Sequence, residues 1–241
     1  MIHDDAKLRK EDYNRRMFDQ GVRAQFHLAR FEWLFAQLPK HGIKECTVFE
    51  LGCHDGKTLE YFQDFGIRVT RYLGMDINDH GGIESAHKKW SDHREFRFEI
   101  GSQASHIPSD SGLFDVAICM ETFEHIPEQT VEGYLERLRS VVAGYFFITV
   151  PIERGIPFLT KYIARPLVAK ENWGMSRAAV WWHLVGKPTK VPHDGHIGFD
   201  DRRLVRQVRK YFNIESLWGI GPRIPTRLIS FQRGIIAVPK R

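Results

Sequence analysis

The residues Val48-Phe49-Glu50-Leu51-Gly52-Cys53-His54-Asp55-Gly56 contain the clearest structural signal in this 241-residue chain. An apolar run, residues 46–51, leads into a glycine-bearing turn, and an amphipathic segment, residues 58–65, follows the turn. This order predicts a buried strand, a tight turn and a helix. The two glycines allow the backbone to bend sharply and let a ligand approach where a Cβ would collide.

The same alternation continues downstream, with short apolar runs separated by helical segments. Such a rhythm predicts a parallel sheet covered by helices on both faces. The runs Val-Ala-Ile-Cys-Met and Tyr-Phe-Phe-Ile-Thr-Val lack an in/out alternation, as expected for strands that are buried on two sides. The predicted strands are 46–51, 71–77, 95–100, 114–120 and 145–150, and the predicted helices are 58–65, 84–90 and 130–142.

The C-terminal part has a different pattern. A predicted helix, residues 200–211, opens with acidic residues, which are favourable at the positive end of its dipole. Two predicted strands, 214–219 and 234–238, follow it and are joined by a loop instead of a helix. We therefore expect an α/β, Rossmann-like fold with seven strands, mainly parallel, and an antiparallel last strand.

The expected organisation is a single domain, 1–241, with two additions. Residues 1–42 are a predicted N-terminal helical extension, with apolar residues at near-helical spacing (Phe26, Leu28, Phe31, Leu34 and Leu38). Residues 152–195 are longer than an ordinary connection and contain half of the tryptophans, so we expect a lid-like insertion that excludes water from a site.

Two acidic residues stand at predicted strand ends, where ligands of open α/β sheets bind. Glu50 ends the first strand, from where it could hold a cationic amino group directly or through water. Asp76 comes 20 residues after Gly56 and is placed to accept hydrogen bonds from ribose hydroxyls. Because His54 interrupts the glycine pattern and Asp55 would repel a pyrophosphate, the turn favours a nucleoside cofactor without phosphate over NAD.

These motifs resemble those of the class I S-adenosylmethionine-dependent methyltransferases, specifically their small-molecule branch. Phe-Glu-Leu-Gly-Cys-His-Asp-Gly is similar to the first motif of that family, Gly-Met-Asp-Ile to the second, and Phe-Asp-Val-Ala-Ile-Cys-Met-Glu-Thr-Phe-Glu-His-Ile-Pro-Glu to its fourth-strand signature. The stretch 191–217 resembles the approach to the last helix and the sixth strand of the family. The resemblance covers residues 47–238 and leaves 1–42 and 152–195 outside it.

The resemblance implies S-adenosylmethionine as the cofactor and assigns roles to residues at four strand ends. Two departures affect these roles: His54 replaces the middle glycine, and Ser102 or Gln103 replaces the acid that often binds the adenine amino group. The implied cofactor-binding residues are Glu50, Gly52, His54, Gly56, Asp76, Ile77, Ser102, Gln103, Met120 and Glu121.

Three further residues are candidates for the chemistry of the acceptor. His125, in the turn after the fourth strand, is the candidate general base, needed only if the acceptor holds its proton at neutral pH. His196 and Trp173 are candidates for lining the acceptor site. His193, Asp194 and His196 have side chains that could hold a divalent ion. No further ligand completes such a set in the sequence, and we predict no metal.

The charge distribution is uneven. Residues 1–152 carry 18 Lys and Arg against 24 Asp and Glu, whereas residues 153–241 carry 17 against 6. The basic half favours an anionic partner, and its mixture with aromatic residues suggests peripheral contact with an anionic membrane. No RNA-binding motif accompanies the charge, so nucleic acid is not expected. Three cysteines without metal spacing, together with a charged N-terminus, indicate a cytoplasmic protein with reduced thiols.

The sequence therefore predicts methyl transfer to a small or glycan- or lipid-linked, anionic acceptor. Two alternatives remain open: a regulator that binds the nucleoside cofactor without turnover, and an NAD-dependent oxidoreductase. The acceptor atom and the oligomeric state stay undetermined.

Overall fold

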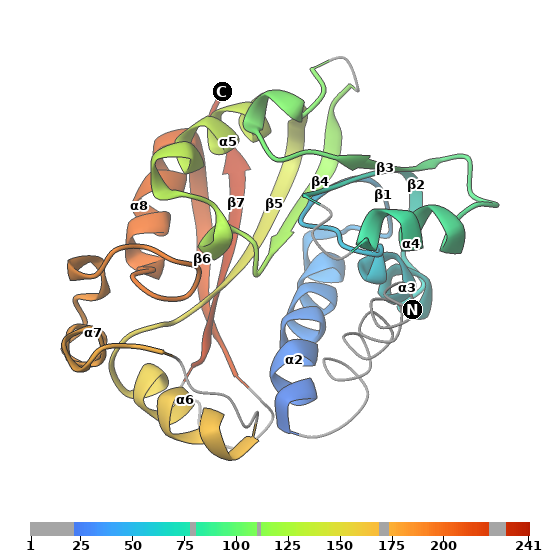
Figure 1. Ribbon diagram of the computed structural model, residues 1–241. Helices are drawn as coiled ribbons and strands as arrows, with labels where there is room; N and C mark the ends of the chain where they lie inside the picture. Colours follow the sequence, from blue (N-terminus) through green and yellow to red (C-terminus); the bar gives the residue numbers. More distant parts are fainter. Residues whose placement is uncertain (1–21, 78–80, 110–111, 169–173, 222–229) are drawn as a thin grey trace, which may run out of the picture.

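A seven-stranded sheet forms the centre of the protein (Figure 1). The computed structural model describes residues 22–77, 81–109, 112–168, 174–221 and 230–241. The strand order is β3-β2-β1-β4-β5-β7-β6, and β7 runs antiparallel to both of its neighbours while the other pairs are parallel. The strands are β1 (Glu45–Leu51), β2 (Arg68–Asp76), β3 (Phe96–Ile100), β4 (Phe114–Met120), β5 (Val142–Pro151), β6 (Phe212–Ile220) and β7 (Gln232–Pro239).

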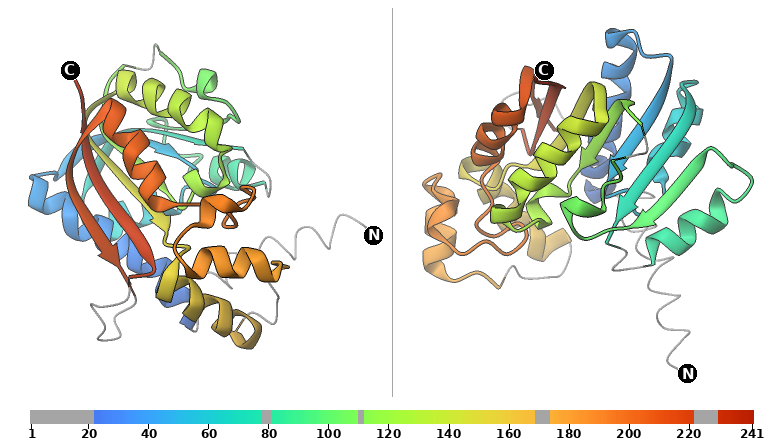
Figure 2. Two further views of the ribbon diagram at one scale, coloured as in Figure 1. Left: turned by 90° about the vertical axis from the view of Figure 1, so that its left-hand side faces the viewer. Right: turned by 90° about the horizontal axis from the view of Figure 1, so that it is seen from above.

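Helices cover both faces of this sheet (Figure 2). One hydrophobic core joins α2, α3 and α4 to the sheet, and a second core joins α5 and α8 to the opposite face. These helices are α2 (Val22–Gln37), α3 (Lys57–Asp64), α4 (Gly82–Lys89), α5 (Glu128–Val141) and α8 (Asp201–Tyr211). The expected Rossmann-like sheet with an antiparallel last strand is confirmed.

The buried strands behave as their composition predicts. β4 lies between β1 and β5, and every residue in it except Asp115 is buried. The side chain of Asp115 instead accepts hydrogen bonds from the backbone N–H and the hydroxyl of Thr47, both at 2.8 Å. Two strands start three residues earlier than expected. β2 begins at Arg68, which pairs with β1, and β5 begins at Val142, directly after α5.

The N-terminal segment is more than an extension. α2 and the 3₁₀ helix η1 (Leu38–His41) pack on the sheet, and Phe31, Leu34, Phe35 and Leu38 are buried in the core shared with α3 and α4. α2 also contacts β6 and β7, at the other end of the chain. The helix is therefore part of the main fold, because its apolar face completes one side of the sheet. The rest of the predicted extension, residues 1–21, lies outside the described residues.

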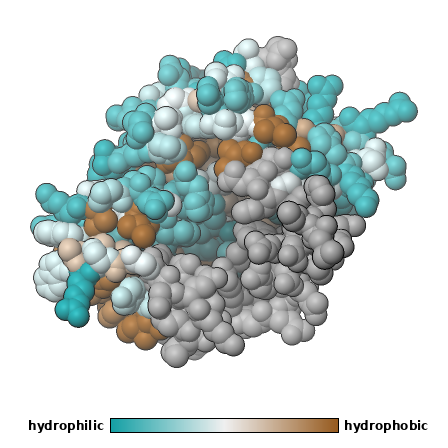
Figure 3. Space-filling model, in the orientation of Figure 1, coloured by the Kyte–Doolittle hydropathy of each residue, from teal (hydrophilic) through white to brown (hydrophobic). Residues whose placement is uncertain are grey.

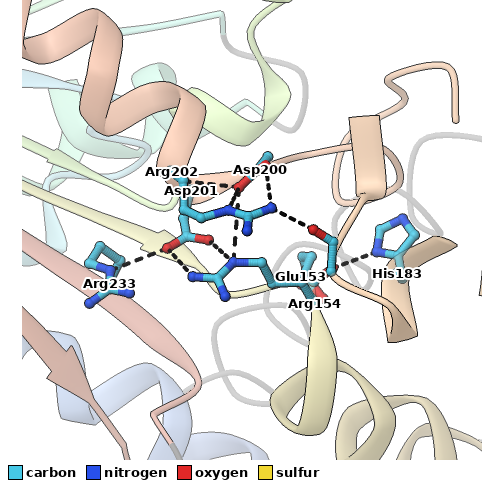
Figure 4. A network of polar contacts seen from close by, with 8 residues as sticks. Glu153, Arg154, His183, Asp200, Asp201, Arg202 and Arg233 are labelled. Atoms are coloured by element: carbon cyan, nitrogen blue, oxygen red, sulfur yellow. Dashed lines mark hydrogen bonds and ion pairs between the residues drawn. The ribbon is translucent and has the colours of Figure 1, made fainter. Parts of the chain in front are cut away.

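The predicted insertion contains two helices and a 3₁₀ turn, α6 (Gly155–Val168), α7 (Arg177–Leu184) and η4 (Pro188–Lys190). A buried network fixes its start (Figure 4). The Asp201 carboxylate accepts hydrogen bonds from Arg154 Nε at 2.9 Å and from Arg233 Nε at 3.2 Å. Asp200 caps α8 by accepting from the backbone N–H of Arg202. The exit of β5 is thus tied to β7 and to the beginning of α8.

Two predictions about composition can also be compared with the structure. Cys46, Cys53 and Cys119 are free and buried, as expected for core thiols. Across the described part of the chain, no helix combines the length and the apolar character needed to cross a membrane.

Candidate functional site

The glycine turn joins the end of β1 to α3 through left-handed backbone. Gly52, His54 and Gly56 have φ values of 80°, 47° and 72°. A Cβ on Gly52 would collide with the side chain of Thr122, and one on Gly56 would collide with Trp90 and Phe98. Glycine is therefore required at both positions, as predicted. The space beside each glycine, where we expected a ligand to approach, is filled by protein side chains.

Asp76 lies against this turn at the end of β2. Its Oδ2 accepts a hydrogen bond of 2.9 Å from the backbone N–H of His54, and the imidazole of His54 lies 3.6 Å from the carboxylate of Asp55. Ile77, the next residue, has 51% of its surface exposed. The second strand thus presents a half-buried carboxylate and an exposed apolar side chain at one edge of the sheet.

Glu50 is buried beneath the same edge. Its two carboxylate oxygens accept hydrogen bonds from the hydroxyls of Thr58, at 2.6 Å, and Tyr72, at 2.5 Å. Burial raises the pKa of Glu50 to about 7, although these two hydrogen bonds oppose the shift. Glu50 therefore connects β1 to α3 and β2 through hydrogen bonds. Its expected contact with a cationic amino group stays a prediction.

Ser102 and Gln103 follow β3 and are exposed. Asp76 pairs with Ile100 in the sheet, so these two residues lie just beyond the strand next to Asp76. The backbone N–H of Ser102 donates to Nδ1 of His106 at 3.1 Å, which orders the turn.

Glu121, directly after β4, has a left-handed backbone conformation. Met120 is buried, and Glu121 adopts a φ of 52°, a conformation that costs a non-glycine residue roughly 1–2 kcal/mol. Oε1 of Glu121 is buried and has no hydrogen-bond partner among the described residues. Burial raises the pKa of Glu121, and the positive charges of Arg30 and His196 oppose the shift.

Two more acids, which are not among the predicted site residues, lie next to Glu121. Glu124, in the 3₁₀ helix η3 (Phe123–His125), is fully buried, and neither of its oxygens has a hydrogen-bond partner in the described chain. Burial and the charge of Glu121 raise its pKa well above the usual range. Glu153 follows β5 and is 1% exposed; its Oε1 accepts from Lys161 Nζ at 2.8 Å and from His196 Nδ1 at 2.9 Å.

Arg30 is a third residue outside the predicted set of site residues. It comes from α2, its Nε is buried without a hydrogen-bond partner among the described residues, and its charge opposes the rise in the pKa values of Glu50, Glu121 and Glu124. The sequence did contain a signal, because Arg30 stands four residues before Leu34 on the apolar side of the helix.

The histidines near β4 and β5 differ in their partners. The rings of His125 and His196 are arranged edge to face, with centroids 5.4 Å apart and an angle of 85° between the ring planes. His193 instead donates from Nε2 to the carbonyls of Glu124 and Gly195, at 2.9 and 3.0 Å, so it does not join His196 in a ligand set. The group in the described chain with metal-ligand spacing is Glu124, His125 and His196, whose ligand atoms lie within 4.8 Å of one another. Trp173 lies outside the described residues.

Comparison with known proteins agrees with this geometry. Residues 14–215 match the family model described as a methyltransferase domain. This match begins before β1, runs through residues 152–195 and ends within β6.

Individual relatives are distant. Ubiquinone biosynthesis O-methyltransferase of Thiobacillus denitrificans is 26% identical over 122 residues, which are 50% of this chain and 50% of that protein, so the matched region spans about half the length of this curated relative. Magnesium protoporphyrin IX methyltransferase of Synechocystis, solved with bound S-adenosylhomocysteine, has a TM-score of 0.62 and 14% identity and covers 95% of this chain and 94% of its own. A protein of Pyrococcus horikoshii has a TM-score of 0.63 and 16% identity, over 95% of this chain and 99% of its own.

The family match extends over most of the chain, and the strand order and the ends of β1, β2 and β4 have the arrangement that the sequence motifs predicted. The chain therefore belongs to the methyltransferase-domain family of S-adenosylmethionine-dependent enzymes.

Proposed function

We propose that this protein transfers the methyl group of S-adenosylmethionine to a small acceptor that binds over the ends of β4 and β5. The observation that carries the proposal is that an arginine and a glutamate, both half-buried, each have a buried atom without a hydrogen-bond partner among the described residues, Nε of Arg30 and Oε1 of Glu121. Buried polar atoms without partners are costly, so such atoms indicate a ligand that satisfies them. The amino-acid end of S-adenosylmethionine carries one carboxylate and one ammonium and matches both groups.

The remaining cofactor roles follow from the strand ends. Asp76 would hold the ribose hydroxyls, Ile77 would contact the adenine, and Ser102 or Gln103 would bind its polar edge. The cofactor supplies a methyl group on a positively charged sulfur. The chain positions the reactants, and positioning alone can contribute on the order of 7–11 kcal/mol in favourable cases.

Calorimetry with S-adenosylhomocysteine and with NAD tests this assignment. We expect the wild-type protein to bind S-adenosylhomocysteine and to ignore NAD, and we expect Asp76→Ala and Arg30→Gln each to weaken binding by at least about tenfold, which is the cost of one lost charge-assisted hydrogen bond. Asp92→Ala, which changes an exposed carboxylate outside the site, is the matched control. If Asp76→Ala and Arg30→Gln both retain the wild-type affinity, the cofactor assignment is wrong.

The acceptor is the finer part of the proposal. We expect a small or glycan- or lipid-linked compound, with α6 and α7 as the lid that excludes water from it, and with His196 and Trp173 lining its site. The positive charge near the site is partly neutralised, because Arg154 pairs with Asp201 and Lys161 with Glu153. An anionic acceptor would therefore contact the more exposed cations of the insertion, such as Lys187 and Lys190.

A lipid-linked acceptor has support from the outer face of α6. Ile156, Leu159 and Ile163 recur at helical spacing and are exposed, and Trp181 of α7 is 60% exposed. Apolar surface over α6 is visible at the lower left of Figure 3. An exposed apolar face beside lysines is typical of contact with an anionic membrane surface. Co-sedimentation with vesicles that contain anionic lipid tests this idea: a requirement for Trp181 and Ile163 supports it, and recovery in the supernatant at every lipid composition excludes it.

Turnover distinguishes an enzyme from a regulator that only binds the cofactor. We expect methylation of at least one member of a panel of phenols, alcohols, amines and carboxylic acids, detected as formation of S-adenosylhomocysteine. Tight cofactor binding without product from any acceptor class would favour the regulator.

A further inference from the structure

A buried carboxylate holds one particular histidine of the site in one orientation. Oε1 of Glu153 lies 2.9 Å from Nδ1 of His196, and Glu153 is 1% exposed. A carboxylate can only accept, so Nδ1 of His196 carries the hydrogen, and in the neutral ring Nε2 is the basic nitrogen. A carboxylate on one ring nitrogen fixes both the tautomer and the direction of the other nitrogen.

The carboxylate is itself held ionised and in place. Burial acts to raise the pKa of Glu153, but the charge of Lys161 and the hydrogen bond from His196 outweigh it and hold the pKa below the usual range. The backbone carbonyl of Glu153 accepts from Nδ1 of His183 at 2.5 Å, and the next residue, Arg154, is fixed on Asp201 (Figure 4). The segment after β5 is thus rigid around Glu153.

His125, our sequence-based candidate for the base, lies beside a different acid, Glu124. Its Nε2 lies 4.0 Å from Oε1 of Glu124, beyond hydrogen-bond distance, and burial raises the pKa of Glu124 well above the usual range. Glu153, whose pKa is held below the usual range, is the carboxylate in hydrogen-bond contact with His196.

The position of the pair suits the acceptor side of the reaction. Glu153 follows β5, whereas Asp76 and Arg30 mark the proposed cofactor side. The carboxyl of Glu121, at the end of β4, interacts with the charges of both Arg30 and His196. The charged or titratable groups that act on this part of the site are Arg30 of α2, Lys161 of α6, Glu121, Glu124 and His125 after β4, and Glu153 after β5.

We propose that Glu153 and His196 form a dyad that removes the proton of a hydroxyl acceptor, so that the protein is an O-methyltransferase with an intrinsic base. This inference rests on the proposed function. The acceptor oxygen forms the new C–O bond, the electron pair of the breaking C–S bond returns to sulfur, and the acceptor proton passes to Nε2 of His196 and then to solvent. Neutral amines need no such base, whereas phenols and alcohols do.

Histidine side-chain ¹⁵N NMR tests the dyad without any acceptor. We expect the His196 resonances, assigned by their loss in His196→Gln, to show a protonated Nδ1 and an unprotonated Nε2 near neutral pH. Glu153→Leu, which removes both acceptor oxygens at similar volume, should abolish this single tautomer. The matched control is Glu95→Leu, which removes the exposed contact of 3.0 Å between His93 and Glu95. A proton on Nε2 in the wild type, or an unchanged tautomer in Glu153→Leu, overturns the proposal.

Kinetics tests the role of the dyad in turnover, with 4-hydroxybenzoate and 4-aminobenzoate as the first matched pair of acceptors. We expect His196→Gln to lower kcat for the hydroxyl by about 10²–10⁴-fold and Glu153→Gln by about 10–100-fold, with little effect on the amine. The wild-type rate for the hydroxyl should rise with pH, and this rise should disappear in His196→Gln. Equal losses for both acceptors, or methylation of amines alone, contradict the proposal.

Two controls separate this inference from its alternatives. S-adenosylhomocysteine must bind to His196→Gln as it binds to the wild type; loss of binding to the wild type itself would instead refute the cofactor assignment. Glu124, His125 and His196 could alternatively ligate a divalent cation, which would occupy the nitrogen that the proposal uses as a base. Stoichiometric metal in the purified protein, with turnover abolished by a chelator and restored by that metal, overturns the dyad.

Discussion

The phenol of Tyr72 donates a hydrogen bond of 2.5 Å to the carboxylate of Glu50, across two adjacent strands and entirely within the core. The hydroxyl of Thr58 donates to the other oxygen of the same carboxylate. Glu50 therefore connects β1, β2 and α3 beneath the glycine turn, and its ionisation is coupled to folding.

Stability should depend on pH through Glu50. Its folded pKa of about 7 lies above the reference value of 4.5, so its contribution is fully present below about pH 4.5 and is lost as the pH rises through 7. Relative to Glu50→Gln, the wild-type free energy of unfolding should fall by up to about 3 kcal/mol between these values. Urea denaturation at several pH values measures this difference, and Glu99→Gln, an exposed carboxyl on β3, is the control. A difference that does not change with pH contradicts the assignment.

The glycine turn should tolerate no side chain at Gly52. Gly52→Ala adds a Cβ that collides with Thr122 and also strains a φ of 80°, whereas Gly42→Ala strains a φ of 75° with no atom within 4 Å. We expect Gly42→Ala to cost about 1–2 kcal/mol of stability and Gly52→Ala about 1–3 kcal/mol more. Chemical denaturation of the two variants isolates the effect of the collision. Equal losses would mean that Thr122 moves aside at no cost.

His183 should stabilise the segment that follows α7, because it links this segment to the end of β5. It is fully buried, its Nδ1 donates to the carbonyl of Glu153, and its Nε2 accepts from the backbone N–H of Gly198 at 3.1 Å. His183→Phe leaves both backbone groups unpaired, at about 1–3 kcal/mol each. Hydrogen exchange should become faster in residues 191–199 of this variant, and Trp181→Phe, an exposed aromatic residue of the same helix, should leave it unchanged.

Lowering the pH should destabilise residues 191–199, as the His183→Phe substitution does. Burial lowers the pKa of His183, so its contribution is present above the unfolded value of 6.5 and is lost as the pH falls below it. Protection of residues 191–199, corrected for intrinsic exchange rates, should therefore decrease between about pH 7.5 and 5.5 in the wild type and change less in His183→Phe. The opposite trend would indicate a protonated His183.

The pair of arginines on Asp201 should depend strongly on that carboxylate. Asp201 is 1% exposed and accepts from Arg154 and Arg233. Asp201→Asn leaves two positive charges without their counterion and should lower stability by about 3–5 kcal/mol. Glu132→Gln, which breaks the exposed pair of Glu132 with Lys210, should cost only about 0–1 kcal/mol. Equal effects of the two substitutions would show that the buried network contributes little.

Much of the fold could be predicted because its signals are local. The turn at Gly52 and Gly56, the apolar runs of β4 and β5, and the closing hairpin each depend on residues that are near each other in the sequence. The carboxyl ends of parallel strands meet at one edge, so the placement of Asp76 and Glu121 at that edge followed from the strand assignments alone.

The tertiary structure decided which side chains meet at that edge and which of them are charged. Arg30 reaches the site because α2 packs on strands from the far end of the chain, and His196 meets Glu153 across 43 residues. Burial raises the pKa of Glu124, whereas Lys161 and His196 hold the pKa of Glu153 below its usual range. Hydrophobic periodicity specifies which face of a segment is buried. It contains no information on the partner that covers that face, and the partner determines the electrostatics of the site.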